Sequence, residues 1–330
     1  MMNVDLRNIL VINFGQVGDV VLSLPAMNAV RKKFPESKIT GLVGKSTRFI
    51  VEMSEIFDEV IPVDRVALRD SGTLWSVSQI FKLVADIRRR KFDLVIDLHS
   101  LSETNLLGFF SGAKTRLFAS RGNRSIDLLS NFRPKPPSFD REMPNSEFYS
   151  QTISVLGVDC HGEKFRIKPD GSAVAEIEQI LKNDGIFEET LVGLNIGAGH
   201  SSRSWEIDNF AELAKMLNEN DDLRVLVFFG PEEEHFRAEI GSKMPSGAII
   251  YDKCYLVQLA AIFSRLKVLV GCDTGPVHLA VSVGVPVVFV SDPLTFYPAS
   301  ENVLIAPKKA HAPVTAKDVF QKIQMLFPQN

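Results

Sequence analysis

The sequence is poor in cysteine, with only three in 330 residues. Cys160, Cys254 and Cys272 are odd in number and widely separated, which argues against a disulfide framework and against a zinc site built from cysteines. Such sparse cysteine is typical of proteins in a reducing compartment. We therefore expect a cytoplasmic protein.

Long apolar runs are also missing. No stretch approaches the roughly 20 apolar residues needed to cross a bilayer. The first apolar stretch, Ile9–Ile12, is too short for the central region of a signal peptide. With 45% apolar and 23% charged residues, the composition is that of a folded globular protein.

The net charge of -3 conceals an asymmetry between the two halves. Residues 1–170 contain 24 Lys and Arg against 20 Asp and Glu, whereas residues 171–330 contain 13 against 20. Basic residues cluster at 88–91 and again at Arg116, Arg121, Arg124 and Arg133. Such clusters either face solvent at helix ends and loops or meet an anionic partner such as a membrane surface. Aromatic residues do not alternate with them, so no nucleic-acid partner is expected.

Short apolar, β-branched segments alternate with helical patterns in both halves, which is typical of βαβ units and parallel sheets. The predicted strands lie near residues 8–13, 38–43, 59–63 and 93–98, then near 191–196, 224–229, 248–251, 267–270 and 286–290. The predicted fold class is α/β, with two doubly wound, Rossmann-like domains, 1–168 and 169–330. Ligands bind at the carboxyl ends of parallel strands, so the loops after the strands are the candidate sites.

The strongest of these loops is Asp273–Leu279, which leads from a strand directly into a helix. Thr274 or Gly275 is expected to cap this helix, with Pro276 at its first position. Free backbone N–H groups and the positive end of the helix dipole suit a phosphate, and His278 adds a further donor. The alternative is a purely structural junction between strand and helix.

The loop Gly197–Trp205 is a second candidate phosphate site. Its glycines allow a ligand to approach the backbone, its serines offer hydroxyl groups, and Arg203 brings a cation suited to bidentate contacts. The alternative is a flexible connector with a surface arginine and with Trp205 in the core.

Two further loops carry carboxylates. The three glutamates of Gly230–Glu234 either favour a helix dipole or accept the hydroxyl groups of a ribose. In Phe14–Asp19, Val17 replaces the second glycine of the dinucleotide fingerprint, so a nicotinamide cofactor is disfavoured. Asp19 itself is either a helix N-cap or a general base.

These loops, in this order and after these strands, resemble glycosyltransferase family 9, the heptosyltransferases that build the inner core of lipopolysaccharide on a GT-B fold. The matching segments are Gly18-Asp19 followed by Leu24-Pro25-Ala26, Arg203-Ser204-Trp205, the Gly230 loop, Asp273-Thr274-Gly275-Pro276 with His278 and Leu279, and Ser291-Asp292-Pro293. The resemblance implies an inverting transfer from ADP-heptose, with the first domain binding the acceptor and the second binding the donor.

The resemblance also implies a role for individual residues. Asp19 corresponds to the catalytic base. The residues implied at the donor are Gly199, Ser201, Arg203, Glu234, Cys254, Asp273, Thr274, Gly275 and His278. Among them, Glu234 is expected at the ribose, with Glu232 and Glu233 as alternatives, and Cys254 is expected at the adenine.

The basic first half is expected to recognise an anionic, lipid-linked glycan, and a peripheral contact to the membrane would accompany it. The residues expected near this acceptor are Gly18, Arg65, Arg69, His99, Arg121 and Arg124.

The sequence departs from the family pattern in three places. Arg203 stands where lysine is typical, Glu103 and Thr104 stand where relatives often carry a Lys-Ser pair, and Phe296–Pro298 lacks a glycine-rich run. Two alternatives therefore stay open. One is a GT-B transferase for another nucleotide sugar or glycan, and the other is a non-catalytic nucleotide-binding module.

We predict that transfer needs no metal ion and no other cofactor. The sequence contains no Asp-x-Asp triplet, the motif with which many other transferases hold a divalent ion. Arg203 and the helix N-terminus at Thr274 would stabilise the departing phosphate instead. Turnover measured with and without EDTA should be essentially equal. Loss of activity on chelation, restored by magnesium or manganese, would contradict the prediction.

Overall fold

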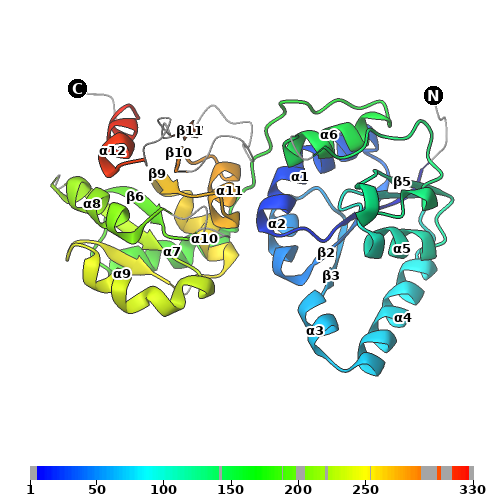
Figure 1. Ribbon diagram of the computed structural model, residues 1–330, viewed down its shortest axis with the longest axis horizontal. Helices are drawn as coiled ribbons and strands as arrows, with labels where there is room; N and C mark the ends of the chain where they lie inside the picture. The colour runs from blue at the N-terminus through cyan, green and yellow to red at the C-terminus, as the bar shows by residue number, and fades with distance from the viewer. Residues whose placement is uncertain are drawn as a thin grey trace. The chain divides into compact units, whose positions relative to one another are not determined.

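The computed structural model describes residues 6–140, 143–187, 189–197, 205–219, 222–252, 254–290, 303–305 and 314–326. It divides into two compact units, Met1–Phe165 and Arg166–Asn330, three residues before the predicted boundary (Figure 1). We call them unit 1 and unit 2. Each contains a parallel sheet with helices, so the predicted α/β fold class is confirmed.

Unit 1 has a five-stranded parallel sheet in the order β3-β2-β1-β4-β5. Its strands are β1 Asn8–Asn13, β2 Lys38–Gly44, β3 Glu59–Val63, β4 Leu94–Asp97 and β5 Thr115–Phe118. Its α-helices are α1 Val17–Lys33, α2 Arg48–Met53, α3 Arg65–Asp70, α4 Thr73–Arg89, α5 Ser102–Phe110 and α6 Asn145–Ser154. The strand order reverses beside β1, so the loops after β1 and β4 leave adjacent strands in opposite directions.

Unit 2 has a six-stranded parallel sheet in the order β11-β10-β9-β6-β7-β8. Its strands are β6 Thr190–Asn195, β7 Leu223–Phe228, β8 Ile249–Tyr251, β9 Leu266–Gly271, β10 Val287–Phe289 and β11 Val303–Ile305. Its helices are α7 Gly171–Asn183, α8 Ile207–Asn218, the 3-10 helix η5 Pro231–Phe236, α9 Arg237–Lys243, α10 Leu256–Phe263, α11 Gly275–Ser282 and α12 Ala316–Gln324. Here the reversal lies between β6 and β9.

Every strand predicted from the sequence is present, with its ends within one residue of the prediction. The prediction missed β5 and β11, which are short. No helix in the described ranges is both long and apolar enough to cross a membrane.

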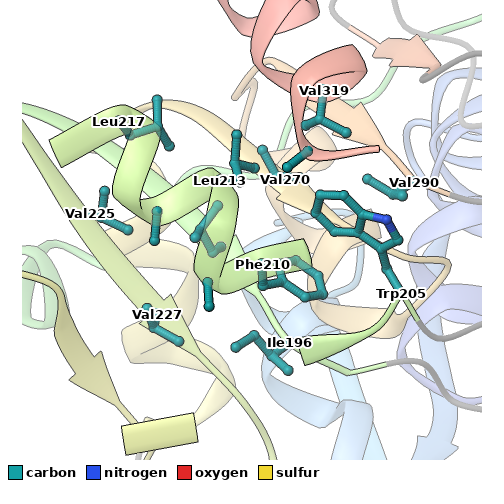
Figure 2. Packing of buried hydrophobic residues seen from close by; sticks show 14 of the residues in the cluster. Ile196, Trp205, Phe210, Leu213, Leu217, Val225, Val227, Val270, Val290 and Val319 are labelled. Carbon is teal, nitrogen blue, oxygen red and sulfur yellow. The ribbon is translucent and has the colours of Figure 1, made fainter. Parts of the chain in front are cut away.

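Packing in unit 2 fixes Trp205, the last residue of the loop Gly197–Trp205. Trp205 lies in the core against Phe210 of α8, edge to face, with ring centroids 4.7 Å apart (Figure 2). Its indole N–H donates to the carbonyl oxygen of Val314 at 2.9 Å, and its backbone N–H donates to Sγ of Cys272 at 3.3 Å. Trp205 thus has the core position that the alternative interpretation of the Gly197 loop gave it, and it ties the start of α8 to β9 and to the segment before α12.

Candidate active site

Asp19 lies at the third position of α1, just after the loop that follows β1. Its Oδ2 accepts a hydrogen bond from the backbone N–H of Gln16 at 3.2 Å, and its Oδ1 accepts one from Nδ2 of Asn145 at 2.8 Å. A Cβ atom at Gly15 would lie 2.4 Å from the Cβ of Asp19, so a glycine is required for this approach. Both carboxylate oxygens are thereby held in place.

The N-cap of α1 is Gln16, so the expectation that Asp19 is an N-cap is wrong. The helix begins at Val17, earlier than the apolar pattern suggested, which moves Asp19 into the first turn. From there its carboxylate reaches back to the N-cap backbone, as the third residue of a capping box does.

Arg121 is enclosed by aromatic rings. Its guanidinium carbon lies 4.5 Å from the centre of the Phe139 ring and 4.3 Å from that of Phe148. Burial lowers the pKa of Arg121, and the neighbouring Tyr149 and Asp19 oppose that shift. Its Nε is buried and has no hydrogen-bond partner among the described residues. Arg121 therefore presents a poorly hydrated cation close to Asp19.

His99 follows β4, next to the end of β1. Burial, and then the positive charges of Arg65, Arg121 and Arg124, lower the pKa of His99 from 6.5 to about 3. Its Nε2 is buried without a hydrogen-bond partner in the described part of the chain. The imidazole is therefore neutral at physiological pH and faces three cations.

Arg65 joins the two loops. Its guanidinium donates to the backbone carbonyl of Phe14 at 2.6 Å and lies 3.8 Å from the carboxylate of Glu103. By contrast, the side chain of Arg69 is 74% exposed and pairs with Asp70, and no contact in the described ranges joins it to this cluster. Of the residues expected at the acceptor, the structure thus brings Arg65, Arg121 and Arg124 near His99. Arg121 also interacts with Asp19, and Gly18 precedes Asp19 in α1.

Asp97, the last residue of β4, is hydrogen-bonded to the turn that carries His99. It is fully buried and accepts hydrogen bonds from the backbone N–H of Ser100 and from Nδ2 of Asn105, both at 2.8 Å. Burial raises the pKa of Asp97 to about 6. The carboxylate shapes the turn that carries His99, two residues further along the chain.

Three residues of this site were missed from the sequence. Asn145 and Tyr149 lie on α6, more than 120 residues after Asp19, and Tyr149 interacts with Asn13 and Arg121. Burial and the nearby Asp19 raise the pKa of Tyr149. No local pattern indicated these roles, because they depend on the packing of α6 against α1. For Asp97, the polar residue at the end of an apolar strand was the available signal.

In unit 2 the loop after β9 begins α11. Thr274 is the N-cap, and its Oγ1 accepts a hydrogen bond from Nδ2 of Asn195, at the end of β6, at 3.2 Å. The helix starts at Gly275, so Pro276 occupies its second position rather than the predicted first. This arrangement leaves the first N–H groups of α11 at the carboxyl edge of the sheet.

Asp273 and His278 are paired across the first turn of α11. Nε2 of His278 lies 2.8 Å from Oδ1 of Asp273. His278 is buried, and its Nδ1 has no hydrogen-bond partner among the described residues. The ring therefore holds Asp273 next to the helix N-terminus.

The three glutamates after β7 have different surroundings. Glu233 points back toward Gly197, where an added Cβ atom would lie 2.9 Å from its Oε1, and its Oε2 accepts a hydrogen bond from the backbone N–H of Gly230 at 3.1 Å. Burial raises the pKa of Glu233. Glu234 is exposed and lies 3.4 Å from Arg237. Glu233 is thus the glutamate turned toward the loop after β6.

The remaining residues expected at the donor are less well defined by contacts. Cys254 is half-buried between β8 and α10, and burial raises the pKa of its thiol to about 11. Gly199, Ser201, Arg203 and the segments 291–293 and 296–298 lie outside the described residues. Within the described residues, no group of three or more His, Cys, Asp or Glu side chains is placed to hold a metal ion.

Known proteins resemble this chain along most of its length. The model of glycosyltransferase family 9 (heptosyltransferase) matches residues 80–322. A Haemophilus influenzae protein named provisionally as a glycosyltransferase is 25% identical over 308 residues, which cover 90% of this chain and 84% of that protein.

Two solved structures share the architecture. The glycosyl transferase family 9 protein from Veillonella parvula has a TM-score of 0.83 and 23% identity, covering 98% of both chains. The ADP-heptose lps heptosyltransferase II of E. coli has a TM-score of 0.75 and 19% identity, covering 97% of this chain and 98% of that one. The two parallel-sheet units are those of the GT-B fold, as the resemblance predicted.

We predict that His99 stays neutral across the physiological pH range. Between about pH 3 and pH 6.5 the folded chain should bind fewer protons at this site than the unfolded chain. The contribution of His99 to the stability of the folded chain is therefore complete above pH 6.5 and is lost as the pH falls. In NMR titrations the His99 resonance should not move between about pH 8 and pH 5, whereas histidines of the urea-unfolded chain titrate near 6.5. Arg121→Leu should raise the pKa of His99. A midpoint near 6.5 in the folded wild type would disprove this assignment.

Proposed function

The chain belongs to glycosyltransferase family 9, and from this premise we propose that it transfers heptose from ADP-heptose to a sugar of the lipopolysaccharide inner core. The reaction proposed is inverting and independent of metal ions. Its single strongest support is the hydrogen bond between Asp19 and Asn145 together with the charge interaction between Asp19 and Arg121, which also acts on His99.

In the proposed reaction, Asp19 removes a proton from the acceptor hydroxyl group. The oxygen attacks the anomeric carbon of the heptose from the face opposite the leaving group. A new C–O bond forms as the bond from the anomeric carbon to the phosphate oxygen breaks, and ADP departs with the electron pair. Asn145 and the backbone N–H of Gln16 orient the carboxylate for this step.

His99 is a weaker candidate for the base. With a pKa of about 3, its imidazole has little affinity for the acceptor's proton at neutral pH. Its buried, unpaired Nε2 suits a hydrogen bond to the acceptor instead. The cations Arg65, Arg121 and Arg124 around it favour an acceptor that carries negative charge.

Unit 2 supplies the groups that suit the leaving nucleotide. The N–H groups at the start of α11, with Thr274 as N-cap, face the carboxyl edge of the sheet, where a diphosphate would be stabilised as its charge develops. Arg203 is proposed as the cation for the same phosphates. For the ribose, Glu233 is better turned toward the Gly197 loop than Glu234.

The identity of the donor is tested by comparing nucleotide sugars. With a fixed acceptor, ADP-heptose should give a kcat/KM higher than that of UDP- and GDP-sugars, because the proposal assigns the nucleotide pocket to adenine. A higher kcat/KM with another nucleotide sugar would support the alternative transferase. Binding of ADP with no turnover on any acceptor would indicate a non-catalytic module.

The role of Asp19 is tested with two variants. The first changes Asp19 alone, and the second also changes its hydrogen-bond partner Asn145. Asp19→Asn should lower kcat by about 100-fold or more, because an amide cannot accept the acceptor's proton. It should also destabilise the fold somewhat. The new side-chain amide at position 19 has one oxygen, which can accept a hydrogen bond from Gln16 or from Asn145. In either orientation, the NH2 group of this amide faces the other of these two donors.

The control is the exchanged variant Asp19→Asn/Asn145→Asp. The amide at position 19 can then accept from Gln16 and donate to the carboxylate at position 145, so thermal stability should recover while kcat stays low. Affinity for ADP should be the same in the wild type, the single variant and the exchanged variant. Turnover close to wild type in Asp19→Asn would remove Asp19 from the mechanism.

A further inference from the structure

Helix α4 of unit 1 carries apolar side chains on two separate stripes. Leu83 and Ile87 pack into the core of the unit. Leu74, Val77 and Phe81 recur at the i, i+3, i+7 spacing of another stripe, and they are 89%, 43% and 69% exposed. A helix needs only one apolar stripe to join its own core, so the second is available for another contact.

Exposed apolar side chains are also present on α5, which packs against α4. The exposed apolar residues of α5 are Leu106, Phe109 and Phe110. The two helices pack beside each other, and the side chain of Arg88, on the same stripe as Phe81, reaches Gly112 just after α5. We call Leu74, Val77, Phe81, Leu106, Phe109 and Phe110 the apolar face of unit 1. Apolar groups gathered in this way mark an interaction surface more often than scattered ones do.

Positive charge surrounds the apolar face. Residues 65–91 contain seven Lys and Arg but only two Asp and Glu. Both acids are already paired, Asp70 with Arg69 and Asp86 with Arg89 and Arg90. Lys82 and Arg88 form no ion pair in the described part of the chain, and Arg116 lies over the Phe109 ring at 5.4 Å.

We propose that the apolar face docks unit 1 on an anionic phospholipid surface. Apolar side chains of an amphipathic helix enter the boundary between headgroups and acyl chains, while flanking Lys and Arg contact the lipid phosphates. Trp75, 45% exposed beside Leu74, suits the headgroup level because its ring is apolar and its N–H is polar. We favour a phospholipid surface over a protein partner because the excess of positive charge in residues 65–91 complements the phosphates of an anionic membrane.

The docking surface is connected to the candidate acceptor site. α3 and α4 form a hairpin that projects from unit 1 (Figure 1). Arg65, the first residue of α3, donates to Phe14 in the loop that leads to Asp19. If the acceptor is lipid-linked, as the proposed function has it, docking would bring the acceptor sugar and Asp19 to the same surface. The docking itself does not depend on that function.

The test is sedimentation of the full chain with vesicles of phosphatidylcholine, with and without phosphatidylglycerol. The wild type should bind the anionic vesicles and lose affinity as salt rises. Phe81→Asp should lower the partition coefficient by at least about tenfold. Arg88→Gln should lower it by about fivefold, the expected effect of one basic residue near the surface. The matched control is Phe187→Asp in unit 2, where the phenylalanine is 67% exposed, and it should bind like the wild type.

Tryptophan fluorescence gives an independent readout. The chain has two tryptophans, and Trp205 is buried in the core of unit 2. Anionic vesicles should shift the emission to the blue, and Trp75→Phe should abolish the shift. Turnover on a lipid-free acceptor should be unchanged in Phe81→Asp, so failure of docking and failure of the proposed activity are distinguishable.

Three results would overturn the proposal. The first is no binding of the wild type to anionic vesicles. The second is equal loss of binding in Phe81→Asp and Phe187→Asp. The third is a concentration-dependent dimer that Phe81→Asp dissociates, which would assign the apolar face to a second copy of the chain.

Discussion

In a parallel sheet every strand ends at the same edge, and this constraint decides which distant residues of the chain meet. In unit 1 it places the loops after β1 and β4 together, so that the ring centroids of Phe14 and His99 lie 6.5 Å apart although 85 positions separate them. In unit 2 the same constraint places Asn195, at the end of β6, against Thr274, after β9. The two candidate sites are thus consequences of strand order, refined by a few hydrogen bonds between loops.

Most of the fold was predictable because buried parallel strands are continuous apolar runs with β-branched residues. β5 was missed because Arg116 interrupts its apolar pattern, and its guanidinium instead bonds the backbone carbonyls of Ala113 and Leu129. The candidate loops were predictable from their position after strands. The contribution of Asn145 could not be predicted, because it depends on how α6 packs on α1. The sequence around Asp19 does not indicate that packing.

Desolvation is the main electrostatic effect in unit 1. It lowers the pKa of His99 and Arg121 and raises that of Asp97, because burial disfavours the charged form of each group. Around His99 the cations Arg65 and Arg124 act in the same direction as burial. A glycosyltransferase of this family must bring a hydroxyl group and a charged leaving group together. In a poorly hydrated cluster of this kind, electrostatic interactions with a bound charged group are stronger than they are in water.

Three hydrophobic clusters of the described residues each lie within one unit, among them the Trp205 cluster of unit 2 and the Leu10 cluster of unit 1. Each unit thus buries an apolar core of its own, and two-state unfolding is not assumed for a chain with more than one such core. A nucleotide that binds native unit 2 stabilises that unit by mass action. Calorimetry of this chain therefore reports on ligand binding as well as on stability.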